Sequence, residues 1–129
     1  MKIPDNAQVF DSPLLVFWFD ENGILCSNSK PVPHTLSTMK ETAEMIKKIL
    51  KGKKVCTVAD NTNSQPINKE IRDYLGKELP NIYKAIASIS NSVLGKTIVN
   101  FYFKLKPPPF PTRIFNTEKE AKEWIKQYL

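Results

Sequence analysis

The chain opens with short, nearly continuous apolar runs and then changes to apolar residues spaced by three and four. Residues 14–19 form an unbroken apolar run, residues 20–23 read Asp-Glu-Asn-Gly, and strand character resumes over residues 24–29. An Asn-Gly pair between two such runs is typical of a tight β-hairpin. The opening pattern therefore predicts two antiparallel strands joined at Asn22 and Gly23.

The pairing within this hairpin decides which side chains share a face. With a two-residue turn, Phe19 lies opposite Cys26 and Trp18 lies opposite Ser27. Phe17, Phe19 and Cys26 are then expected to face the core. Trp18 falls on the other, more mixed face, which predicts incomplete cover there and makes Trp18 a candidate for an association surface.

Strands and amphipathic helices alternate after the hairpin. The spacing predicts helices over residues 35–50, from Pro66 to about residue 79, and from Ser90 or Asn91 to about residue 105. Buried strands are expected over residues 55–59, 85–89 and 113–115. Thr117 and Glu120 form a capping box that begins a closing helix.

This order predicts an α/β fold with a five-stranded, mostly parallel sheet, an N-terminal antiparallel hairpin and four helices. The 129 residues suit a single domain over 1–129. Charged residues make up 25% and the hydrophobic set 41%, which is ordinary for a soluble globular chain. No apolar run approaches the roughly 18 residues of a membrane span, and the first residues lack a signal core, so the cytoplasm is the expected location.

The net charge of +6 raises the question of an anionic partner. Most basic residues alternate with acidic ones, and the one clear cluster is formed by Lys47, Lys48, Lys51, Lys53 and Lys54. A solvated helix end explains this cluster, because cations favour the C-terminal end of a helix dipole. An anionic membrane surface or a polynucleotide is kept as the alternative, although the sequence contains no recognisable nucleic-acid-binding motif, which disfavours nucleic acid as a partner.

Three segments resemble one known family: LVFWFDENGIL at 15–25, VCTVAD at 55–60 and RIFNTEKEAKEW at 113–124. They are similar to SpoIIAA-like, or STAS, domains, and the likeness extends over nearly the whole chain. The family includes anti-sigma-factor antagonists and small stand-alone bacterial proteins. The resemblance implies a SpoIIAA-like fold and a regulatory, non-enzymatic module that works by protein association.

Switching members of that family carry a phosphorylated serine in an Asp-Ser-Ser-Gly element after the central strand. The corresponding stretch here contains Asp60, Thr62 and Ser64, but no Ser-Gly pair follows Asp60. The resemblance makes Ser64 or Thr62 a candidate phosphorylation site, and a phosphate there would be favoured by the amides of a helix starting at Pro66. The alternative is that both hydroxyls make turn and cap hydrogen bonds.

The sequence assembles no catalytic or metal site. His34 is the single histidine, Cys26 and Cys56 are separated and expected to be buried and reduced, and four glycines give no phosphate loop. We therefore expect no enzyme activity, no cofactor and no metal. Asp60 is still the first polar position to test, because it ends a central strand where α/β sheets place ligand sites.

An apolar excess marks the third predicted helix and the Pro-rich segment after it. The excess consists of four large apolar side chains, Val99, Tyr102, Phe103 and Phe110. They either pack under the Pro-rich segment within the domain or form an exposed surface that contacts a protein partner, a second copy of the chain or lipid. The favoured hypothesis is a protein-interaction module that forms a homodimer. The alternative is a binder of a small apolar or lipid-like ligand.

Overall fold

The computed structural model describes residues 1–91, Lys96 and residues 108–129. Its centre is a six-stranded sheet with the strands in sequence order, from β1 (Phe10–Asp11) through β2 (Leu15–Phe19), β3 (Leu25–Ser29), β4 (Val55–Asp60) and β5 (Tyr83–Ile89) to β6 (Thr112–Phe115). The first two strand pairs are antiparallel, and the pairs from β3 to β6 are parallel. The predicted α/β class with a mostly parallel sheet is confirmed.

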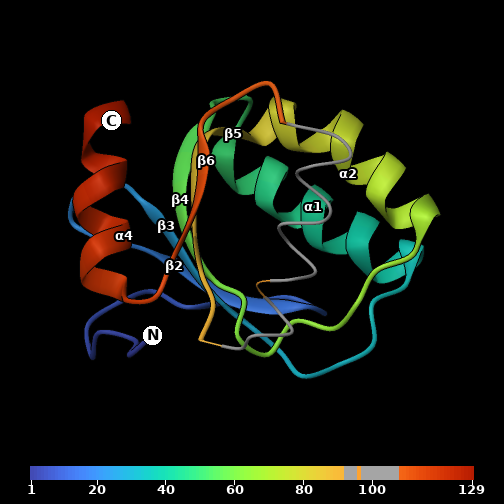
Figure 1. Cartoon of the computed structure of the whole chain (residues 1–129), viewed down its shortest axis with the longest axis horizontal. Coiled ribbons are helices and arrows are strands. Elements are labelled where there is room, and N and C mark those ends of the chain that lie inside the picture. Colours follow the sequence, from blue (N-terminus) through green and yellow to red (C-terminus); the bar gives the residue numbers. More distant parts are fainter. Residues whose placement is uncertain (92–95, 97–107) are drawn as a thin grey trace.

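Helices cover both faces of the sheet (Figure 1). One face carries α4 (Glu118–Ile125) and the short 3-10 helix η1 (Lys126–Tyr128), and the other carries α1 (Leu36–Leu50) and α2 (Lys69–Ile82). The sequence missed β1, since two residues are too short to give an alternating pattern. The third predicted helix, with Val99, Tyr102 and Phe103, lies outside the described residues.

The hairpin register differs by one residue from the predicted one. Trp18 pairs with Cys26 and Phe19 pairs with Leu25. The turn is longer because the Asp20 carboxylate accepts hydrogen bonds from the backbone amides of Asn22 and Ile24, at 2.9 and 3.0 Å. Gly23 takes the left-handed conformation, with φ of 76°. The extra residue in the turn moves Trp18 to the face that carries Cys26, because side chains alternate along a strand.

The two faces of the sheet form two buried clusters. Trp18, Cys26 and Val58 pack against α4 on one face, and Phe17 and Leu25 pack against α1 and α2 on the other. Only 2% of the Trp18 surface is exposed. The predicted incomplete cover of the Trp18 face was wrong, because α4 folds back over it.

The helix boundaries follow side-chain caps. The closing helix begins as predicted, with the Glu120 amide donating to the Thr117 hydroxyl oxygen at 3.2 Å. The second helix starts later than predicted, because the Asn68 side chain accepts from the Ile71 amide at 2.9 Å and caps it there. It also continues through Pro80, which lies within its last turn.

Candidate functional site

Polar residues gather where the parallel strands end. Ser29 ends β3, Asp60 ends β4 and begins the loop over residues 60–65, and Ser88 lies one residue before the end of β5. Parallel strands place their carboxyl ends at one edge of the sheet, which is the usual location of ligand sites in open α/β sheets. We call this region the carboxyl edge and the segment 60–65 the edge loop.

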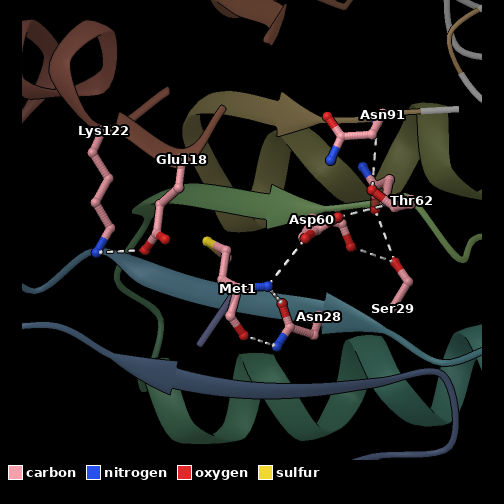
Figure 2. A network of polar contacts seen from close by, with 9 residues as sticks. Met1, Asn28, Ser29, Asp60, Thr62, Asn91, Glu118 and Lys122 are labelled. Carbon is pink, nitrogen blue, oxygen red and sulfur yellow. Dashed lines mark hydrogen bonds and ion pairs between the residues drawn. The ribbon is translucent and has the colours of Figure 1, made fainter. Parts of the chain in front are cut away.

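Asp60 is the charged centre of this edge (Figure 2). Its Oδ2 lies 3.0 Å from the Met1 ammonium, and its Oδ1 accepts a hydrogen bond from the Thr62 amide at 3.1 Å. Asn28 secures the same ammonium, accepting from it at 2.6 Å and donating to the Met1 carbonyl at 2.7 Å. The exposed fraction of the Asp60 side chain is 21%.

Two opposing influences set the pKa of Asp60. Burial raises it, but hydrogen bonds from Thr62 and the charge and hydrogen bond of the Met1 ammonium outweigh burial, so the pKa is lowered from its ordinary value. Asp60 is therefore ionised at neutral pH, which suits a structural or binding carboxylate and not a proton donor.

Hydrogen bonds between uncharged groups hold the edge loop against β3 and β5. The Ser64 hydroxyl donates to Ser29 Oγ at 2.8 Å, and Ser29 Oγ lies 3.1 Å from Asn61 Oδ1. Asn61 Nδ2 donates to Ser88 Oγ at 2.7 Å. The backbone N–H of Asn61 also donates to the backbone carbonyl of Ile89 at 2.8 Å. The loop is thus tied to the strands on both sides of β4.

The structure brings together the three loop residues that the sequence selected. Thr62 Oγ1 accepts a long hydrogen bond, 3.5 Å, from the Asn91 amide (Figure 2). The proposed helix-end environment for Ser64 was wrong, because α2 starts at Lys69 and not at Pro66. The free amides of that helix end belong to the turn after Asn68, and Ser64 bonds to Ser29 instead.

Sequence reasoning missed the residues that complete this hydrogen-bonded cluster, namely Asn28, Ser29, Asn61 and Ser88. Each lies at or near the end of a parallel strand, and this shared position is the signal that could have found them. Their spacing along the chain is irregular, so no motif links them before the strand order is known.

The other candidates have different environments. Trp18 is buried, so its ring is not available to a partner, which corrects its assignment as an association surface. Phe110 is half-buried, and its carbonyl accepts from the Thr112 hydroxyl at 3.3 Å. Val99, Tyr102 and Phe103 lie outside the described residues, and their role stays a prediction.

In the described residues, the two cysteines and the histidine take no part in the hydrogen bonds of the carboxyl-edge cluster. Cys26 and Cys56 are free and buried as predicted, and burial raises the pKa of the Cys26 thiol to about 12. Both ring nitrogens of His34 are buried without a hydrogen-bond partner, and burial lowers the His34 pKa. Within residues 1–91 and 108–129 and at Lys96, no three His, Cys, Asp or Glu side chains are grouped to hold a metal ion.

A hollow of about 650 Å³ lies between α1 and the segment following β1. Its lining mixes acidic and basic side chains with two apolar residues: Asp11, Pro13, Glu41, Glu44, Met45, Lys47 and Lys48. Ligand pockets for apolar molecules are mostly hydrophobic. This lining does not favour the apolar-ligand alternative.

The fold is that of an α/β domain with a cluster of polar side chains at the carboxyl edge of a mostly parallel sheet. An uncharacterized protein of the DUF3478 family from Shewanella loihica PV-4, described as having a SpoIIAA-like fold, is similar over 97% of this chain and 99% of its own, with a TM-score of 0.65 and 13% identity. The family model of a domain of unknown function, DUF7793, matches residues 17–129, and the chain belongs to that family. Comparison with curated proteins finds no significant match.

Among the described helices, none combines the length and apolar character needed to cross a bilayer.

Proposed function

We propose that this chain is a non-enzymatic regulatory module that binds a protein partner through the edge loop. The observation that carries the proposal is the preorganised state of that loop. Its backbone and its inward side chains are fixed by Ser29, Ser88 and Ile89, whereas Asn63, Gln65 and Pro66 remain exposed. A loop fixed before binding loses little conformational entropy when a partner docks.

The chemistry of the edge also supports binding over catalysis. Asp60 is held ionised by its hydrogen bonds and by an ammonium group, and the neighbouring side chains are neutral hydroxyls and amides. Such groups donate and accept hydrogen bonds but do not form a nucleophile with an adjacent base. Polar, partly exposed side chains with their hydrogen bonds already made are typical of the rim of a protein–protein interface.

Photo-crosslinking tests this proposal with a matched pair of positions. A benzophenone amino acid replaces Asn63 in the edge loop or, as the control, Asn81 near the end of α2, and both asparagines are exposed. The experiment uses the full chain in the cells that produce it. We expect one reproducible protein adduct from position 63 and none of that mass from position 81.

The mass of the adduct identifies the kind of partner. Twice the mass of the chain indicates a homodimer, and any other mass indicates a different protein. Equal adducts from both positions, or none from position 63 when both variants remain folded, would refute an association site at the edge loop.

Regulation would act on the same hydrogen bonds. A phosphate on Ser64 would remove the hydrogen bond to Ser29 and add negative charge close to Asp60, so it would open the loop and weaken association. Ser64→Asp is expected to lower the crosslinking yield at position 63, whereas Ser64→Ala lacks the charge and should lower it less. A yield that falls equally in both variants would assign Ser64 a packing role without a switch.

A further inference from the structure

The end of the sheet opposite the edge loop carries a group of lysines from different elements. Lys51, Lys53 and Lys54 lie in and after the turn that joins α1 to β4, and Lys48 lies in the last turn of α1. Lys84 joins them from β5, because Tyr83 pairs with Val55 at the start of β4. Figure 1 shows this α1–β4 turn at the upper end of the sheet and the edge loop at the lower end. We call the five lysines the basic edge.

The basic edge is exposed and unbalanced in charge. All five lysines are exposed, and none forms an ion pair with another residue in the described part of the chain. Other lysines do pair: Lys30 lies 2.5 Å from Asp11, and Lys47 lies 2.8 Å from Glu78. The basic edge therefore concentrates five positive charges of a chain whose net charge is +6.

The dipole of α1 explains only part of this arrangement. Lys48 and Lys51 lie at the helix C-terminus, where a cation is favoured within the last turn. Lys53 and Lys54 follow the helix, and Lys84 belongs to a different element. The pairing of β4 with β5 places Lys84 next to the start of β4, and the helix end does not explain this placement.

The backbone at the helix end also has an unusual residue. Lys51 has φ of 53° and ψ of 45°, in the left-handed region, and Gly52 follows with φ of 80°. Glycine is the residue that takes the left-handed position at a helix end without a steric cost. A lysine in this conformation carries some backbone strain, and Lys51 is exposed.

We propose that the basic edge binds the surface of an anionic membrane. The charges are all lysines, which act as compact point charges and attract anionic headgroups without needing a fixed geometry. An anionic membrane surface attracts each basic residue close to it by about 1 kcal/mol, and the basic edge offers five such residues. The basic edge offers no arginine for bidentate contacts to bases or phosphates, which makes nucleic acid a poorer match. Membrane contact at this edge leaves the edge loop free for a protein partner.

Vesicle co-sedimentation of the purified full chain tests the proposal. The vesicles are phosphatidylcholine alone or phosphatidylcholine with about 30% phosphatidylglycerol, and each is tested at about 0.1 M and about 0.5 M NaCl. We expect binding to the anionic vesicles at low salt and loss of binding at high salt. An absence of binding to anionic vesicles at low salt would overturn the proposal.

Two charge-matched double variants separate the basic edge from general positive charge. Lys53→Gln with Lys54→Gln removes two charges from the basic edge, and Lys2→Gln with Lys119→Gln removes two exposed charges elsewhere. We expect the first double variant to lower the partition coefficient by about fivefold per lysine, or about 25-fold for the two together, and the second by less than about threefold. Equal losses in the two double variants would overturn the assignment to this edge.

A competition arm distinguishes lipid from other polyanions. Duplex DNA and polyglutamate are added at charge concentrations equal to that of the anionic lipid, with bound chain measured by sedimentation. Retention on the vesicles supports a membrane surface. Complete displacement by DNA or by polyglutamate would overturn it in favour of a nucleic acid or an acidic protein. Circular dichroism of each variant confirms that the fold is retained.

Discussion

Replacement of Trp18 by alanine is the strongest test of how the hairpin lies in the fold. The ring is 2% exposed and packs in the cluster formed by Ile24, Cys26, Val58 and α4. In the register expected from sequence, the same ring would lie on a partly covered face. The two arrangements predict very different losses of stability.

The size of the loss follows from the buried area. A buried tryptophan removes about 150–250 Å² from water, which at about 25 cal/mol per Å² corresponds to about 4–6 kcal/mol as an upper bound. Measured losses for such truncations are about 3–5 kcal/mol. We expect Trp18→Ala to lower the free energy of unfolding by about 3–5 kcal/mol, a large share of the roughly 5–15 kcal/mol that a domain has.

Urea unfolding followed by far-UV circular dichroism measures this change without relying on tryptophan fluorescence. Trp18→Phe keeps a buried ring and is expected to cost about 1–2 kcal/mol, so it remains measurable if the alanine variant is unfolded. Val9→Ala is the control, because Val9 is 45% exposed and should change stability by less than about 0.5 kcal/mol. A Trp18→Ala loss no larger than that of Val9→Ala would refute the buried position and the observed register.

Two further predictions concern the cap of α4 and the pH dependence of stability. Thr117→Ala removes the acceptor for the Glu120 amide and should lower the free energy of unfolding in urea by about 1 kcal/mol. Thr117→Ser keeps a hydroxyl and should retain most of this stabilisation. Equal losses in the two variants would show that the hydroxyl does not cap the helix. The lowered pKa of Asp60 means that its ionised form stabilises the folded state above the ordinary pKa of about 4, and that this contribution is lost as pH falls through the folded-state pKa. The stability difference between the wild type and Asp60→Asn should therefore be largest near neutral pH and shrink in acid, and a difference that is constant from about pH 7 to pH 3 would contradict this account.

Local signals in the sequence were sufficient for most of the secondary structure. The spacing of apolar residues predicted α1, and the Thr117 cap predicted the start of α4. The resemblance to SpoIIAA-like domains and the regular alternation of strands and helices predicted the α/β class. These features depend on residues only a few positions apart, where propensity, side-chain caps and periodicity act directly.

The sequence alone placed Asp60, Thr62 and Ser64 in one loop but not against their partners. Asn28 and Ser29 reach this loop only because β3 lies beside β4, and Ser88 reaches it because β5 lies on the other side. Strand neighbours that are distant in the chain leave no local pattern. Their side chains become a cluster only when the parallel order of the strands is fixed.

The tertiary structure also decided which faces are buried and where the charges collect. A single extra residue in the Asp20 turn changed the pairing of Trp18, and α4 then buried a ring that the local pattern had left on a mixed face. Likewise, Lys84 joins the lysines after α1 through strand pairing alone. The sequence determined the elements because their signals are local, whereas the register and the packing of layers depend on contacts between distant segments and were decided by the fold.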